Sequence, residues 1–268
     1  MIDLGKRNLL GVNISALDYE AAVGKIVDAA ENRRALGVSA LAVHGVMTGA
    51  MDDTHRHRLN QLELIVPDGQ PVRWALNLLY GTALPDRVYG PNLMLKTCAA
   101  AAQRGLGIFL FGGRQELLND LQIKLLEKIP DLKILGTMPS RFRTITPEEK
   151  SEIIQAIAAS GAAITMVGLG CPRQEVWAYE FKDELRMPVL AVGAAFNFHA
   201  GRLPQAPPWM QRLGLEWFYR LTKEPTRLWQ RYLLLNPYYL TLLFLQWSKL
   251  KTFDPASTTP PERETLYG

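Results

Sequence analysis

The stretch "LELIVPDGQPVRWALNLLYG", residues 62–81, changes from a run of apolar residues to a helical pattern within two positions. The run 62–67 is nearly continuous in Leu, Ile and Val, which is typical of a strand covered on both faces. The residues after Gly69 follow a helical pattern. Asp68 stands between the two elements. Taken alone, its place favours a helix N-cap over a catalytic group, because capping Asp residues are common.

Similar apolar runs recur along the first two hundred residues, at 36–43, 106–113, 132–137, 162–170 and 188–196. Helical segments such as 114–129 and 146–160 lie between them. In the second of these, Thr146 and Pro147 with the two glutamates that follow indicate an N-cap, a first helical position and a charged first turn. The alternation predicts an α/β fold, with a Rossmann-like, mostly parallel sheet and flanking helices.

Near residue 200 the composition changes to Trp, Tyr, Leu and Arg, and the strand pattern ends. We therefore predict a Rossmann-like core at 1–200, a C-terminal helical appendage at 201–252 and a flexible tail rich in Pro, Ser and Thr at 253–268. The longest apolar stretch, 232–247, is shorter than the roughly 20 residues that a spanning helix needs, and Asn236 and Pro237 interrupt it. We expect it to lie on a membrane rather than to cross one.

The overall composition argues against several classes of protein. The net charge is +4, from 30 basic and 26 acidic residues, without the concentrated basic tract typical of nucleic-acid binding. The two cysteines, Cys98 and Cys171, form no CxxC pair, so neither a disulfide framework nor a zinc site is indicated. The N-terminal residues lack the apolar segment of a secretory signal, and we expect a cytoplasmic protein.

Candidate ligand-binding residues follow four of the predicted strands, where ligands bind in open parallel sheets. They are Asp68, the glycines Gly112 and Gly113, the segment 168–175 ("GLGCPRQE") and the segment 196–202 ("FNFHAGR"). The glycine pair either presents backbone N–H groups to a phosphate or makes a tight turn. The segment 168–175 lacks the third glycine and the later acid of a dinucleotide fingerprint, so a nucleotide is compatible with it but NAD is not favoured.

No Asp-x-Asp occurs in the sequence, so the usual carboxylate ligand for a metal–diphosphate complex is missing. Charge on a diphosphate would then be met by arginines or by backbone N–H groups. The C-terminal segment carries three arginines at nearly helical spacing beside aromatic and leucine residues: Arg220, Arg227 and Arg231. This stripe either binds an anionic headgroup at a membrane surface or is a solvated face whose aromatic residues pack on the core.

Six motifs occur in an order and at distances that resemble the WecG/TagA/CpsF family of bacterial glycosyltransferases: "VPDGQPVRWA", "RVYGPNLM", "LFGG", "VGLGCPRQE", "VGAAFNFHAG" and "GLEWFYRLTKEPTRLWQRY". The resemblance runs from about Leu36 to Tyr232. It implies a Rossmann-like fold whose C-terminal appendage closes over the active site. It also implies inverting, metal-independent transfer of a sugar from UDP to a polyprenyl-diphosphate-linked saccharide at the cytoplasmic membrane face, with no cofactor.

The resemblance also assigns roles to individual residues. Asp68 corresponds to the catalytic base, Arg87 lies near the donor or leaving-group phosphates, and Gln174 belongs to the donor pocket. The arginines of the last motif are expected to meet the acceptor's diphosphate and the membrane: Arg220, Arg227 and Arg231. The backbone near Gly112 and Gly113 is expected to contribute further donors to the UDP phosphates.

The chain departs from the family pattern at four positions where family members often have another polar or acidic residue: Ala42, His44, Asn92 and Asn197. His44 either replaces a lost hydrogen bond to the donor, since imidazole donates or accepts, or is a buried residue with one backbone partner. These departures leave the donated sugar open, and they keep a donor-binding protein without transfer activity as an alternative.

Two further alternatives are an unrelated nucleotide-dependent enzyme on the same fold and a peripheral membrane-binding module. Exposed apolar surface on the C-terminal segment would also favour a homo-oligomer where no membrane is present.

Overall fold

The computed structural model describes residues 1–268, apart from the side chains of Arg227, Gln230 and Arg231. Its centre is a sheet with the strand order β4-β3-β8-β7-β5-β6, in which every neighbouring pair is parallel. The six strands are β3 (Leu36–Leu41), β4 (Leu64–Pro67), β5 (Gly107–Phe111), β6 (Lys133–Met138), β7 (Ile164–Val167) and β8 (Pro188–Ala191). Five of them lie within predicted runs and β6 extends one residue beyond the run 132–137, so the predicted sheet is confirmed.

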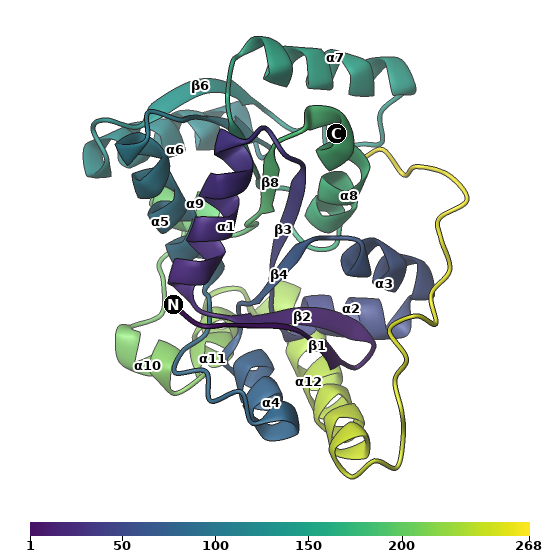
Figure 1. Cartoon of the computed structure of the whole chain (residues 1–268). Helices are drawn as coiled ribbons and strands as arrows, with labels where there is room; N and C mark the ends of the chain where they lie inside the picture. Colours follow the sequence, from purple (N-terminus) through teal and green to yellow (C-terminus); the bar gives the residue numbers. More distant parts are fainter.

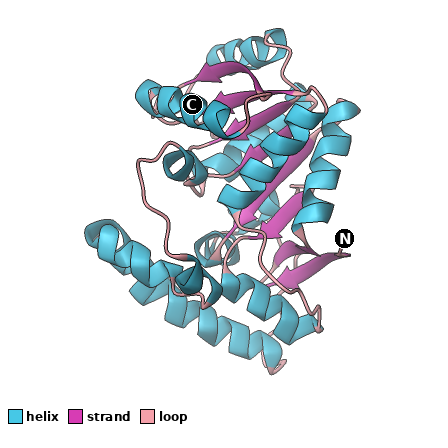
Figure 2. Cartoon of the chain, turned by 90° about the vertical axis from the view of Figure 1, so that its left-hand side faces the viewer, coloured by secondary structure: helices cyan, strands magenta, loops and turns pink.

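Helices cover both faces of this sheet (Figures 1 and 2). Alternate strand residues point to opposite faces, so that Phe109 and Phe111 join one hydrophobic cluster and Leu110 joins the other. One face packs against α1 (Tyr19–Glu31), α5 (Gly90–Gln103), α6 (Gln115–Lys128) and α9 (Ala195–His199). The opposite face packs against α2 (Val43–Met51), α3 (Asp53–Asn60), α7 (Pro147–Ala159) and α8 (Arg173–Leu185). Burial of both faces explains the near-continuous apolar runs.

The helix at 146–160 begins as its sequence predicts. Thr146 accepts a hydrogen bond from the Glu149 N–H at 3.3 Å, and the Glu149 side chain accepts one from the Thr146 N–H at 2.9 Å. This reciprocal pair is a capping box, with Pro147 at the first helical position.

The chain order of the strands creates a switch point beside β3. The chain passes from β3 to β4 at one edge, crosses to β5 and β6 at the other edge, and returns through β7 to β8, next to β3. Loops after β3 and β8 therefore diverge at the carboxyl edge of the sheet, where open α/β sheets bind ligands.

Sequence analysis missed an antiparallel hairpin of β1 (Asp3–Leu9) and β2 (Val12–Leu17). The two residues between the strands both have positive φ, at 55° for Leu10 and 89° for Gly11. Such a turn fits the twist of a hairpin, but Leu is an unusual residue at positive φ. Of the two turn residues, only Gly11 is of a type that indicates such a turn in the sequence.

Four more helices complete the fold: α4 (Gln70–Tyr80), α10 (Pro208–Arg212), α11 (Glu216–Lys223) and α12 (Pro225–Trp247). Helix α12 packs beside α2 and α4, and its Tyr239 and Leu242 join the core cluster. The helical content after residue 200 agrees with the prediction, while the domain boundary itself stays a prediction. Within the described part of the chain, no helix combines the length and the apolar character needed to span a membrane.

The tail at 253–268 has no helix, but it makes defined contacts as it runs back along the molecule (Figure 1, yellow). Glu180 of α8 accepts hydrogen bonds from the Thr265 and Leu266 N–H groups at 2.6 and 2.9 Å. Leu266 is buried in the core, and the Gly268 N–H donates to the Arg143 carbonyl. These contacts attach the tail to residues that lie far away in the sequence, while its flexibility stays a prediction.

Candidate active site

Asp68 directly follows β4, and its backbone N–H donates to the carbonyl of Leu41 at the end of β3. Helix α4 instead has Gly69 as its N-cap and no side-chain capping bond, so the interpretation of Asp68 as the cap of that helix is wrong. The Asp68 Oδ1 accepts a hydrogen bond from the N–H of Gly90, the first residue of α5, at 2.6 Å. The carboxylate therefore satisfies a helix start, but one that lies 22 residues further along the chain.

The other oxygen of this carboxylate, Oδ2, has no hydrogen-bond partner among the described residues. Asp68 keeps some solvent contact through the cavities beside it, but burial of its carboxyl raises the pKa to about 6, against the opposing effects of Arg87 and the Gly90 N–H. A carboxyl with this pKa is largely ionised at neutral pH and still basic enough to take a proton. Asp68 therefore combines a fixed orientation with an unoccupied basic oxygen.

Two cavities meet at Asp68. The first has a volume of about 240 Å³ and is lined by the loops after β3, β7 and β8, with Gln174 and Asn197 among its polar residues. The second, of about 90 Å³, lies against the C-terminal helices and is lined by Trp217, Tyr232 and Leu235. We call them the polar cavity and the amphipathic cavity. Four residues line both and thus form the junction: Ala42, Asp68, Glu216 and Arg220.

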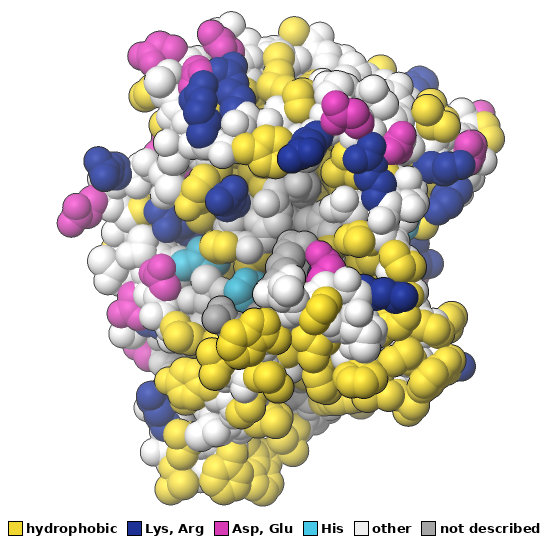
Figure 3. All heavy atoms as spheres, turned by 180° about the vertical axis from the view of Figure 1, so that it is seen from behind, with side chains coloured by type: hydrophobic (Ala, Val, Ile, Leu, Met, Phe, Trp, Pro, Cys, Tyr) yellow, Lys and Arg dark blue, Asp and Glu magenta, His cyan; other side chains and the backbone are white. Residues whose placement is uncertain are grey.

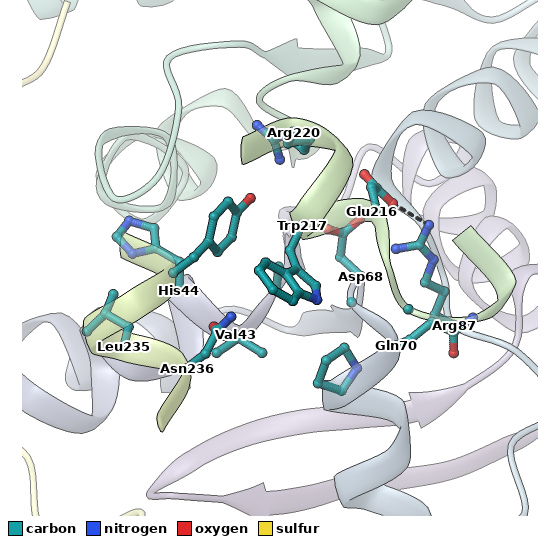
Figure 4. Close-up of a pocket in the computed structure, with 15 residues that line it drawn as sticks. Val43, His44, Asp68, Gln70, Arg87, Glu216, Trp217, Arg220, Leu235 and Asn236 are labelled. Carbon is teal, nitrogen blue, oxygen red and sulfur yellow. Dashed lines mark hydrogen bonds and ion pairs between the residues drawn. The ribbon is translucent and has the colours of Figure 1, made fainter. Parts of the chain in front are cut away.

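Arg87 lies beside Asp68 and lines the amphipathic cavity (Figure 4). Its guanidinium Nη2 lies 2.6 Å from Oε2 of Glu216, at the start of α11, and 4.2 Å separates the guanidinium from the centre of the Tyr89 ring. The Tyr89 hydroxyl donates to the other carboxylate oxygen of Glu216 at 3.1 Å. Sequence reasoning missed Glu216, although it stands inside the motif "GLEWFYRL". The motif alone did not predict a role for this acid, because its partners Arg87 and Tyr89 come from the core.

Gln174 lies at the base of the polar cavity, near the start of α8. Its side-chain carbonyl accepts the Gly170 N–H at 3.1 Å, and its amide donates to Oε1 of Glu175 at 2.9 Å. Glu175 is fully buried, and Ser39 of β3 donates to the same oxygen at 3.0 Å. Burial raises the pKa of Glu175, against its hydrogen bonds. This chain of hydrogen bonds fixes the orientation of the Gln174 amide at the wall of the polar cavity.

The two glycines after β5 do not line either cavity. The Gly112 N–H donates to the carbonyl of Met138 at 2.9 Å, so it is not an open donor for a phosphate. With φ values of 111° and 73°, Gly112 and Gly113 make the tight turn that is the other interpretation of this pair. Gly113 lines a separate cavity formed with Arg143, Arg173 and the tail.

The remaining predicted site residues are divided between the cavities. His44 lines the amphipathic cavity rather than the polar one, close to Leu235 and Asn236 (Figure 4). Arg220 reaches both cavities and has no ion pair among the described residues. The predictions for Arg227 and Arg231 lie outside the described side chains.

Large apolar side chains gather over the end of the molecule that contains the C-terminal helices (Figure 3). We call this surface the apolar face. Its exposed residues include Trp209, Leu213, Phe218, Trp229, Leu233, Leu234, Leu240, Phe244 and Trp247. Patches of this kind mark interaction surfaces more often than ordinary solvated surface does.

The site thus joins a half-buried carboxylate of raised pKa, a paired arginine and a polar cavity at the switch point of a parallel sheet. Residues 7–252 match the model of the family described as "Glycosyl transferase WecG/TagA/CpsF family". This match spans most of the 268 residues and confirms the resemblance inferred from the motifs. The chain belongs to the WecG/TagA/CpsF family of glycosyltransferases.

Proposed function

We propose that this chain transfers a sugar from a UDP-sugar to a polyprenyl-diphosphate-linked saccharide, by a single inverting displacement that needs no metal, in the synthesis of a bacterial surface or exopolysaccharide. The observation that carries the proposal is the place of Asp68 between two cavities of different character. A transferase that forms no covalent intermediate must hold donor and acceptor together on either side of one base. Asp68 has that position and a suitable pKa of about 6.

The polar cavity is suited to the donor. It opens at the carboxyl ends of β3, β7 and β8, where nucleotides bind in open α/β sheets. Gln174, held on two sides, offers a fixed amide to the sugar or its phosphates. Asn197 lines the same cavity and would contribute to the choice of sugar through its amide.

The amphipathic cavity is suited to an acceptor that carries a lipid. Trp217, Tyr232 and Leu235 would contact the saccharide and the first prenyl units, while Arg220 would meet the acceptor's diphosphate. The apolar face lies on the same C-terminal helices and would dock on the cytoplasmic surface of the cell membrane. Arg227 and Arg231 would then contact anionic headgroups.

In the proposed reaction, Asp68 Oδ2 accepts the proton of an acceptor hydroxyl as its oxygen attacks the anomeric carbon. The bond from that carbon to the UDP oxygen breaks, and UDP leaves with the electron pair. Because the acceptor oxygen attacks the face of the anomeric carbon opposite to UDP, the configuration of that carbon is inverted. Arg87 would stabilise the charge on the leaving diphosphate of UDP, while the Gly90 N–H keeps the Asp68 carboxylate oriented.

The test is transfer by the purified full-length chain with lipid vesicles, a panel of UDP-sugars and short-chain prenyl-diphosphate-linked saccharides, followed by mass spectrometry. We expect an acceptor heavier by one sugar residue, unaffected by chelator, and greatly reduced in Asp68→Asn. Asp120→Asn is the matched control, because it changes an exposed aspartate of α6 that lines neither cavity.

UDP binding without a product from any pair would contradict the proposal and favour a donor-binding protein that does not transfer. Full activity in a folded Asp68→Asn variant would remove Asp68 as the base and leave it as the residue that orients the start of α5.

A further inference from the structure

Glu216 forms a buried ion pair that joins the C-terminal helices to the core. The exposed fraction of its side chain is 12%, and that of its partner Arg87 is 8%. Besides Nη2 of Arg87 at 2.6 Å, the carboxylate of Glu216 holds the hydroxyl of Tyr89 at 3.1 Å. Gln211 accepts a second, longer hydrogen bond from the same Arg87 nitrogen at 3.2 Å. Arg87 is thus committed to groups of its own chain.

Such a pair is weak evidence for a purely stabilising role. Removing two charges from water costs about as much as their attraction returns, and an apolar pair of the same volume often stabilises a fold equally well. A carboxylate bound to an arginine also uses the same donors, in the same geometry, as a phosphate would. Glu216 therefore occupies the place on Arg87 that a phosphate group of a substrate would take.

The charges at the junction also indicate that Glu216 occupies the place of a phosphate group. Asp68 and Glu216 contribute two carboxyl groups there, Arg220 contributes one cation, and the guanidinium of Arg87 lies against Glu216 at its border. A diphosphate that entered this junction would face both carboxyl groups and be repelled unless one of them moved away. Asp68 is held by the Gly90 N–H, whereas Glu216 has another cation within reach, since Arg220 lies four residues further along α11.

We propose that Glu216 is an internal anion that holds Arg87 until the diphosphate group of a substrate replaces it, and that Glu216 then pairs with Arg220. The inference rests on the proposed function, because that function supplies the diphosphate. The group comes either from the UDP donor or from the prenyl-diphosphate acceptor. Since α11 carries Glu216, the exchange would link occupation of the site to the position of the C-terminal helices.

The experiment compares the binding of UDP and of farnesyl diphosphate to the full-length chain and to Glu216→Gln, by isothermal titration calorimetry at pH 7.5. We expect Glu216→Gln to bind about tenfold more tightly the compound whose diphosphate uses Arg87, because the competing carboxylate is gone. Glu224→Gln is the matched control: it removes the same charge eight positions along the chain, outside both cavities.

A second pair of variants separates exchange on Arg87 from a general loss of negative charge. Binding is compared between Arg87→Ala and the double variant Arg87→Ala/Glu216→Gln. If Glu216 acts through Arg87, the tenfold gain disappears in this background. A gain of the same size there, or no gain for either compound in Glu216→Gln itself, overturns the inference.

Should Glu216→Gln fail to fold, Tyr89→Phe provides the same test in a milder form. It deletes the hydroxyl that donates to Oε1 of Glu216 and leaves the ring against Arg87. We expect tighter binding of the same compound, by about threefold. Unchanged or weaker binding to folded Tyr89→Phe contradicts the inference.

These measurements need no turnover, so the inference and the proposed function can fail separately. Tighter binding that depends on Arg87, in a chain that never transfers a sugar, would retain the exchange and reject the function. Transfer by the wild-type chain with no change of affinity in the variants would retain the proposed function and reject the exchange.

Discussion

Helices α8 and α12 serve the two cavities of the site, and they reverse the usual relation between polarity and burial. Helix α8 is rich in charged and polar residues, yet it buries Gln174, Glu175, Glu180 and Lys182. Helix α12 is rich in Leu, Tyr and Trp, yet it exposes a row of large apolar side chains: Trp229, Leu233, Leu234, Tyr238, Leu240, Phe244 and Trp247.

The comparison separates two ways in which a helix departs from an amphipathic pattern. The four buried polar side chains of α8 named above each have at least one hydrogen-bond partner, such as Ser39 for Glu175 and the tail for Glu180, so α8 orients other parts of the chain. Among the side chains that the structure describes, the exposed apolar residues of α12 have no hydrogen-bond partner, so that helix offers a surface. Asp68, where the two cavities meet, depends on both arrangements.

The largest effect is expected at the junction itself. Asp68→Asn should lower the rate of sugar transfer by about 10²- to 10⁴-fold, because a general base is lost. In the wild-type chain, kcat/KM should fall about tenfold per pH unit below about pH 6, since the pKa of Asp68 is about 6 and the base must be ionised. A pH profile of transfer checks both. A profile that stays flat down to pH 5 would identify a different base.

The same variant should stabilise the fold at high pH. The pKa of Asp68 is raised from 3.8 to about 6, so ionisation opposes folding above about pH 6, and this penalty vanishes below pH 3.8. We expect Asp68→Asn to raise the free energy of unfolding by about 1–3 kcal/mol at pH 8. Urea denaturation at pH 8 and at pH 4 measures the difference. An equal gain at both values would point to packing instead.

On the α12 side, Leu233→Ser/Leu234→Ser should reduce transfer to a vesicle-bound acceptor by roughly 100-fold, since each leucine contributes roughly 1.5 kcal/mol when its side chain leaves water. Transfer to a short, water-soluble acceptor and the thermal midpoint should change little, because both side chains are already exposed. Vesicle flotation with the paired transfer assay checks this. An equal loss with both acceptors would place these leucines in the site rather than at a membrane.

On the α8 side, Glu180→Gln should lower the free energy of unfolding by about 1–3 kcal/mol, because a single amide oxygen replaces the two carboxylate oxygens that accept the Thr265 and Leu266 N–H groups. Hydrogen exchange should show faster exchange at 265 and 266. Asp183→Asn, an exposed neighbour on the same helix, is the control. Unchanged exchange at these two amides would mean that Glu180 does not hold the tail.

The smallest effect is expected for Gln174→Ala, which removes one oriented amide from the polar cavity. We expect the KM for the UDP-sugar to rise about threefold to tenfold and kcat to stay within about twofold, as for the loss of one hydrogen bond made throughout the reaction. Steady-state kinetics with a fixed acceptor separates the two constants. A fall in kcat at constant KM would move Gln174 from donor binding to the chemical step.

The sequence predicted the features that depend on short-range patterns. Apolar runs identified the six strands, of which all but the edge strand β6 are buried on both faces, and Thr146 with Glu149 predicted a helix start that the structure confirms. Motif spacing identified the family, which the match over residues 7–252 confirms. Asp68 became a candidate site residue because it follows a strand at the edge where ligands bind, and the family resemblance assigned it the role of base.

Other features depended on contacts that no local pattern contains. The helix start that Asp68 satisfies belongs to α5, the partner that Arg87 holds is Glu216, 129 residues away, and the docked tail depends on Glu180. Periodicity is set by the nearest turn or strand, whereas these pairs form only after the chain has folded back on itself. The sequence by itself therefore determined the sheet, the family and the candidate base. The tertiary structure alone decided which residues meet that base, because long-range hydrogen bonds and ion pairs leave no periodic trace in the chain.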